Sequence, residues 1–173
     1  MREQESWKRL LGSLSLCLAL LFLAGCRRTY VASNCMEPLI PMNAAVSFEP
    51  LGDRPLARGD IIAIDEVEDF DNIRMGRVIA LPGDRVRVER KRVFLNGRPL
   101  QEPYAVFRDP AVLQPDDPVP FAAHRDFMQE ITVGRSEVFV LCDNRDEAAE
   151  DSRFFGPFVG GRVRGLIVQE QRP

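Results

Sequence analysis

Beyond residue 29, turn signals divide the chain into short apolar runs, and this spacing constrains the fold more than any other feature. The chain contains thirteen prolines and twelve glycines, which favour turns and interrupt helices. The clearest turn signals are Pro82-Gly83-Asp84 and Asn96-Gly97, because glycine and asparagine tolerate positive φ. No helical periodicity of useful length appears in this part of the sequence. We therefore predict an all-β domain of curved antiparallel sheets.

The predicted strands are apolar or alternating runs bounded by these turns. They are Ala45–Glu49, Ile61–Asp65, Ile73–Ala80, Arg85–Glu89, Arg92–Asn96, Glu130–Val133, Glu137–Cys142 and Arg162–Gln169. Asp109 to Ala123 is rich in proline and aspartate, which predicts a long surface loop.

An almost uninterrupted apolar run, Leu10 to Cys26, precedes this domain and is flanked by basic residues on both sides. Its length of about 17 residues lies at the lower edge for a membrane-spanning helix. We therefore divide the chain into a membrane anchor or signal segment, residues 1–29, and a β domain, residues 30–173. Leu23-Ala24-Gly25-Cys26 also resembles a bacterial lipobox, in which Cys26 would be lipidated. A net charge of −3 gives no reason to expect nucleic acid.

The segment from Val138 to Gly156 combines an apolar run with a dense cluster of opposite charges. Charges that follow a buried strand are expected to pair with one another, because an unpaired buried charge is costly. We predict a paired network, with a solvated surface loop as the alternative. Its members are Arg77, Asp143, Asn144, Arg145, Asp151 and Arg153.

Four further motifs accompany this segment: Ser33–Pro38, Arg58–Ile62, Arg74–Asp84 and Val93–Leu100. In this order and spacing the set resembles the type I signal peptidase family, from about Tyr30 to Val168. The resemblance implies the fold of enzymes that remove signal peptides from exported preproteins. It also implies an uncleaved helix in the inner membrane, with the β domain on the outer, non-cytoplasmic side. We favour that helix over lipidation, because the nucleophile motif follows the apolar run closely, as in the family.

Three departures from the family fall on its reactive centre. Cys35 stands where the family has its nucleophilic serine, and Gly76 where it has the lysine that acts as general base. Ala148 replaces a serine that orients this lysine. Arginine stays protonated at any working pH and cannot act as the base. The only lysines, Lys8 and Lys91, match no catalytic position, so we expect no Ser/Lys catalysis.

A cysteine needs less help than a serine, because part of it is already thiolate at neutral pH. An active Cys35 endopeptidase is therefore the alternative, assisted by a nearby arginine or by the single histidine, His124. Ser33 matches a family serine that helps to stabilise the oxyanion, or is simply a turn residue. Cys35 and Cys142 are the only cysteine pair in the domain, and their spacing does not decide whether they form a disulfide.

Two further expectations concern packing and binding. If Cys142 faces Gly76, it would fill part of the space left by the missing lysine. A peptide would bind by strand addition alongside Ile73, Arg74 and Met75, with Met36 nearby. The sequence thus predicts a catalytically degenerate, membrane-anchored protein that binds an extended peptide or preprotein segment. It predicts no cofactor and no metal, and an envelope lipoprotein scaffold remains a third possibility.

Overall fold

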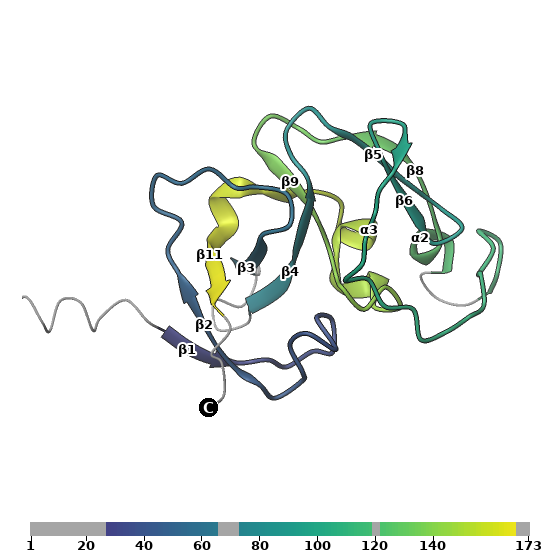
Figure 1. The fold of residues 1–173 in the computed structure, drawn as a ribbon. Coiled ribbons are helices and arrows are strands. Elements are labelled where there is room, and N and C mark those ends of the chain that lie inside the picture. Colours follow the sequence, from purple (N-terminus) through teal and green to yellow (C-terminus); the bar gives the residue numbers. More distant parts are fainter. Residues whose placement is uncertain (1–26, 66–72, 119–121, 169–173) are drawn as a thin grey trace, which may run out of the picture.

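The computed structural model describes residues 27–65, 73–118 and 122–168, which form two antiparallel sheets (Figure 1). The large sheet has seven strands in the order β1-β2-β11-β3-β4-β9-β10, and the small sheet has four in the order β7-β6-β5-β8. The prediction of antiparallel sheets is confirmed for these residues.

The bounds of the elements follow the turn signals closely. The large sheet contains β1 (Arg27–Tyr30), β2 (Ala45–Glu49), β3 (Ile61–Asp65), β4 (Ile73–Ala80), β9 (Glu137–Leu141), β10 (Phe158–Val159) and β11 (Val163–Val168). The small sheet contains β5 (Arg85–Glu89), β6 (Arg92–Leu95), β7 (Arg98–Pro99) and β8 (Phe127–Thr132). Short helices are α2 (Ala122–Arg125), η1 (Ala148–Glu150), α3 (Ser152–Phe155) and η2 (Gly160–Arg162).

β9 joins the two sheets, because its alternate side chains enter different apolar clusters. Val138 and Val140 pack with residues of β3 and β4, whereas Phe139 and Leu141 pack with the small sheet. This alternation is what a strand with both faces buried requires. The residue that follows β9, Cys142, belongs to a third cluster with Val31, Met36 and Met75, so the end of β9 lies where the three clusters approach one another.

Two glycine positions fix local geometry. Asn96 and Gly97 have φ values of 51° and 80° and form the predicted tight turn between β6 and β7. A Cβ on Gly165 would lie 2.1 Å from the Glu49 carbonyl oxygen. Only glycine therefore lets β11 approach β2 this closely, beside the register shift in its pairing with β3.

The predicted strands agree with the structure, with differences at their ends. Four ranges are the same at both ends, whereas β8 starts at Phe127 and not at Glu130. β1, β7 and β10 were not predicted, and β1 runs across the boundary that we placed after residue 29.

The apolar run Leu10–Cys26 lies outside the described residues, so the anchoring helix stays a prediction. Within the part of the chain that is described, no helix is long and apolar enough to cross a membrane.

Candidate functional site

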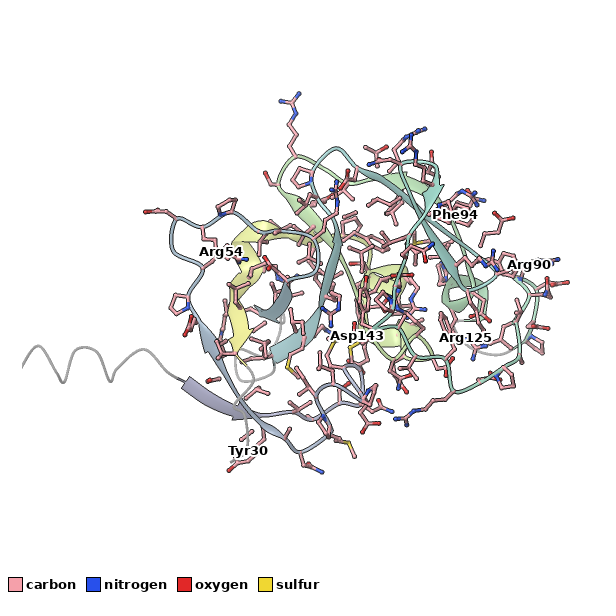
Figure 2. All side chains as sticks on the ribbon, viewed as in Figure 1. Tyr30, Arg54, Arg90, Phe94, Arg125 and Asp143 are labelled. Atoms are coloured by element: carbon pink, nitrogen blue, oxygen red, sulfur yellow. A yellow bond between two sulfur atoms is a disulfide. The ribbon has the colours of Figure 1, made fainter. Side chains whose placement is uncertain are left out.

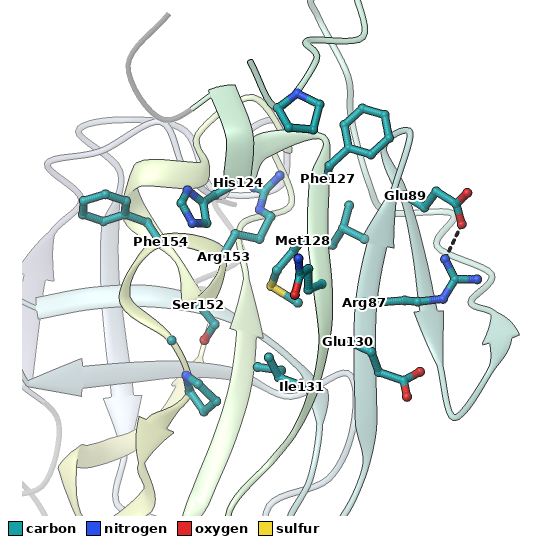
Figure 3. Close-up of a pocket in the computed structure, with 15 residues that line it drawn as sticks. Arg87, Glu89, His124, Phe127, Met128, Glu130, Ile131, Ser152, Arg153 and Phe154 are labelled. Carbon is teal, nitrogen blue, oxygen red and sulfur yellow. Dashed lines mark hydrogen bonds and ion pairs between the residues drawn. The ribbon is translucent and has the colours of Figure 1, made fainter. Parts of the chain in front are cut away.

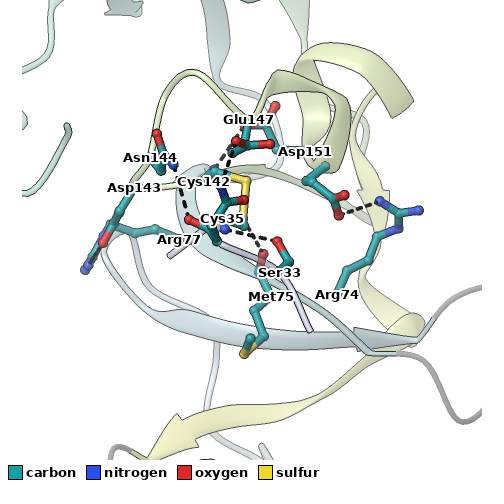
Figure 4. The surroundings of a disulfide bond; sticks show 12 residues. Ser33, Cys35, Arg74, Met75, Arg77, Cys142, Asp143, Asn144, Glu147 and Asp151 are labelled. Atoms are coloured by element: carbon teal, nitrogen blue, oxygen red, sulfur yellow. Dashed lines mark hydrogen bonds and ion pairs between the residues drawn. A yellow bond between two sulfur atoms is a disulfide. The ribbon is translucent and has the colours of Figure 1, made fainter. Parts of the chain in front are cut away.

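A disulfide joins the two domain cysteines at the position of the expected nucleophile. The Cys35 and Cys142 Cα atoms are 4.9 Å apart, and the two residues are only 3% and 0% exposed. The bond ties the loop after β1 to the residue that follows β9 (Figure 4). A nucleophile requires a free thiolate, so Cys35 has no nucleophilic sulfur in this oxidised form.

The groups around Cys35 hold the loop in place. The Cys35 amide donates to the Ser33 hydroxyl oxygen at 3.0 Å, and the Cys35 carbonyl accepts from the Asn144 amide at 2.9 Å. The Cys35 sulfur lies 3.3 Å from the Met75 carbonyl oxygen. The amide of residue 35 is therefore already hydrogen-bonded within the loop, to the Ser33 hydroxyl oxygen. Among the residues described, none brings an amine or imidazole into hydrogen bonding with the Cys35 sulfur.

Gly76, where the resemblance led us to expect the general-base lysine, is closed in by a side chain of β9. Gly76 lies on β4 opposite Ile62, and a Cβ added to it would lie 2.4 Å from Val140 Cγ1 and 3.3 Å from the Leu141 carbonyl oxygen. We expected Cys142 to fill part of this space if it faces Gly76. The atom closest to an added Cβ is Val140 Cγ1, so Val140 closes the position most directly.

The N-terminal half of β4 presents a strand edge beside the cystine. β4 pairs with β3 from Ile73 to Arg77, but with β9 only from Arg77 onward. The backbone of Ile73–Met75 therefore has no β9 partner on its second side. Arg74 lies here, 3.3 Å from a Glu150 carboxylate oxygen and 4.1 Å from the centre of the Phe155 ring.

Met36, which we predicted to contact a peptide, is fully buried in the cluster that contains Cys35 and Met75. Its side chain packs beneath the loop and is not available at the surface. Of the four residues predicted to line the peptide site, the structure thus brings Ile73, Arg74 and Met75 to one strand edge and places Met36 behind it.

The predicted charged network is paired and buried, so the solvated alternative is wrong for it. Asp143 is 0% exposed and lies between the two sheets (Figure 2), where both carboxylate oxygens accept from Arg77 at 2.8 and 2.5 Å. The hydrogen bonds that Arg77 donates to Asp143 raise the Arg77 pKa against the effect of burial. Arg77 also stacks on Tyr104, and burial raises the pKa of the Tyr104 hydroxyl.

The other network residues surround the cystine. Asp151 accepts from Arg153 Nη2 at 2.7 Å and from the Cys142 amide at 3.0 Å. Asn144 donates from Nδ2 to the Asn34 carbonyl at 3.3 Å. The network thus fixes the backbone on both sides of the disulfide.

Sequence reasoning missed two acidic partners of this network. Arg145 pairs with Glu102 at 2.6 Å, and Asn34 donates to Glu147 at 3.0 Å. Glu102 lies outside any predicted strand, and no periodic signal pointed to it. Among the described residues, no cluster of three or more His, Cys, Asp or Glu side chains could hold a metal ion. His124 is exposed in α2 and lines a groove whose lining includes neither cysteine.

Comparisons with known proteins agree with the motifs. A sequence model of the family described as "Signal peptidase, peptidase S26" matches residues 4–169. The probable signal peptidase I-1 of Synechocystis is 30% identical over 166 residues, which cover 88% of this chain and 74% of that protein. Signal peptidase I P of Bacillus subtilis subsp. natto is 31% identical over 62% of this chain and 55% of its own length.

Several curated relatives are longer than the matched region, and this chain spans about half of their length. A crystal structure of a signal peptidase I from Enterococcus faecalis is 29% identical, with a TM-score of 0.49. The matched region covers 66% of this chain and 98% of the chain in that structure. Because the family match extends over nearly the whole sequence, the chain belongs to the signal peptidase family S26.

Proposed function

We propose that this chain is a membrane-anchored, catalytically degenerate member of the family that binds extended peptide or preprotein segments. The observation that carries the proposal is the buried Cys35–Cys142 disulfide at the nucleophile position, beside a glycine at the base position. Acyl transfer needs a nucleophile and a base that removes its proton. Here the sulfur is already bonded, and Val140 closes the place where a lysine would begin.

Binding does not need these groups. An extended peptide can add to the edge of β4 at Ile73–Met75 through backbone hydrogen bonds alone, and pockets beside the edge then give specificity. Arg74, Glu150 and Phe155 lie next to this edge and would contact the side chains of such a peptide. The relatives' name, signal peptidase, suggests signal-peptide segments of exported preproteins as the ligand class.

The disulfide also supports the proposed location. Disulfides persist in oxidising compartments and are rare in the cytosol. A buried structural cystine therefore fits a β domain on the non-cytoplasmic side of the inner membrane, held there by the apolar run Leu10–Cys26.

One observation favours a second candidate, a redox-dependent endopeptidase. Cys35 keeps the nucleophile position, and the Ser33 hydroxyl lies beside its amide. Reduction of the disulfide by a thiol would give Cys35 a free sulfur. The third possibility, a lipidated scaffold protein, predicts a mass shift from acyl groups at Cys26.

The test is a cleavage assay on the full chain in detergent, with a preprotein as substrate. Cys142→Ala and Cys35→Ala are a matched pair, because each removes the disulfide but only the first leaves a thiol at position 35. We expect no cleavage by either variant or by the wild-type chain, with or without dithiothreitol. Cleavage by Cys142→Ala that an alkylating agent abolishes, and that Cys35→Ala lacks, would establish the endopeptidase.

Binding is tested separately by hydrogen exchange. Addition of the preprotein should protect the backbone amides of residues 73–76, because a new strand would pair with them. A complex that forms without protection of this segment would contradict strand addition at β4.

A further inference from the structure

A groove of about 870 Å³ lies between β8 and α3, within the size range of ligand sites (Figure 3). Phe127, Met128 and Ile131 of β8 contribute to its lining, together with Phe154 of α3 and Pro157. The lining includes none of Ile73, Arg74 and Met75, so the groove is distinct from the β4 edge.

The groove is lined by an edge strand, β8, together with Arg87, Val88 and Glu89 of its neighbour β5. β8 is the last strand of the small sheet, and its only strand partner among the described residues is β5. Alternate backbone N–H and C=O groups of an edge strand point away from its partner, and they form a template for another extended chain. A strand edge beside an apolar surface is the arrangement that binds peptides by strand addition.

The arginine and glutamate side chains that line the groove are already paired within the protein. Arg87 pairs with Glu89, Glu130 with Arg85 at 3.1 Å, and Arg153 with Asp151 at 2.7 Å. A charged ligand side chain would therefore lose water without gaining a counter-charge of its own. The groove thus fits an uncharged, apolar segment.

The shape of the groove fits one extended peptide strand better than it fits the edge strand of another sheet. Phe154 lies across from β8 and bounds the groove on its second side (Figure 3), and Pro157 also lines the groove. β1 and β11, where the described chain begins and ends, lie in the large sheet, away from the groove (Figure 1).

We propose that this groove is a second peptide site, which takes an extended, uncharged, apolar segment of another protein as a fifth strand on β8. The test uses the full chain in detergent and a fluorescent, capped heptapeptide of alternating threonine and valine. We expect a rise in fluorescence anisotropy on binding and protection of the amides of residues 127–132 from hydrogen exchange. The same peptide with prolines in place of two threonines should not bind, because proline lacks the N–H donor.

Matched variants separate the groove from general surface effects. Phe154→Asp should weaken binding at least about tenfold, because it places a charge in the apolar groove. Phe107→Asp is the control, since Phe107 is 43% exposed, Phe154 is 41% exposed, and only Phe154 lines the groove. Gln129→Asp adds a charge at an exposed lining position with no loss of packing, and it should weaken binding in the same direction.

Three results would overturn the proposal. Protection confined to residues 73–76 would place the peptide at the β4 edge and support the proposed function alone. Protection of residues 127–132 that rises with protein concentration, without peptide, would assign the edge to a second copy. Equal effects of Phe154→Asp and Phe107→Asp, or no binding at all, would remove the site.

Discussion

Two neighbouring regions of this molecule, the charged network and the surroundings of Cys35 and Gly76, differ in how far they keep the residues of the family motifs. The charged network is complete, and each of its buried ions has a partner, as in Arg77 with Asp143 and Arg153 with Asp151. At the positions that the resemblance assigns to the nucleophile and the base, this chain has a disulfide and a glycine. The difference follows from electrostatics. Loss of one ion from a buried pair leaves the other uncompensated, whereas a cystine and a glycine leave no charge behind.

We expect the largest loss of stability from a substitution in the charged network. Asp151→Ala should lower the free energy of unfolding by about 3–5 kcal/mol, because it leaves the Arg153 guanidinium buried without a counter-charge. The measurement is urea unfolding followed by circular dichroism.

The control is Glu130→Ala, which breaks a pair with Arg85 in which the side chains are 36% and 56% exposed. It should cost at most about 1 kcal/mol. Similar losses for the two variants would mean that the network is no more important than surface pairs, and the comparison between the two regions would fail.

We expect removal of the disulfide to cause the second-largest loss of stability. The Cys35→Ala/Cys142→Ala double variant should lose about 2–4 kcal/mol, because the bond closes a loop across 107 residues and restricts the unfolded chain. Cys17→Ala, a cysteine outside the β domain, should leave the unfolding midpoint unchanged. A thiol reagent that reacts with Cys35 in the folded, untreated protein would contradict the buried disulfide.

The positions of these two regions were only partly predictable from sequence. The ranges of β2, β3, β4 and β5 were predicted at both ends, because each is an apolar or alternating run bounded by turn residues. β1, β7 and β10 have four, two and two residues, too few for a periodic signal. The pairing of the charges followed from their place after a buried strand.

The details of the reactive region could not be predicted. A separation of 107 residues says nothing about the distance between Cys35 and Cys142. The choice between Val140 and Cys142 as the neighbour of Gly76 depends on strand register and side-chain direction, which a sequence does not fix. The partner Glu102 lies 43 residues from Arg145, and only the folded chain brings them together.

A smaller loss of stability is expected from adding a side chain at Gly76. Gly76→Ala should destabilise the protein by about 1–3 kcal/mol, because the new Cβ would overlap with the stiff, β-branched Val140 side chain. Urea unfolding measures the loss.

The double variant Gly76→Ala/Val140→Ala should be more stable than the sum of the single losses predicts, since Val140→Ala opens the space that the new methyl group needs. Gly161→Ala is the control, because nothing lies within 4 Å of a Cβ at that position, and it should change stability by less than about 1 kcal/mol. Additive losses at Gly76 and Val140 would show that the site of the missing lysine is open.

The smallest effect concerns a carboxylate outside both regions, and it tests whether complete pairing is a general feature of the scaffold. Burial alone would raise the Asp84 pKa, but hydrogen bonds from Arg58, the Leu81 amide and Asn96 hold it below its usual value. Its contribution to stability is therefore present above the unfolded pKa of about 3.9 and is lost as the pH falls through the lower, folded pKa. Asp84→Asn should cost about 1 kcal/mol at pH 7, and the difference from wild type should shrink below about pH 4. The exposed Asp53→Asn control should show no such difference at either pH, and an Asp84→Asn loss that stays constant with pH would assign the effect to shape and not to charge.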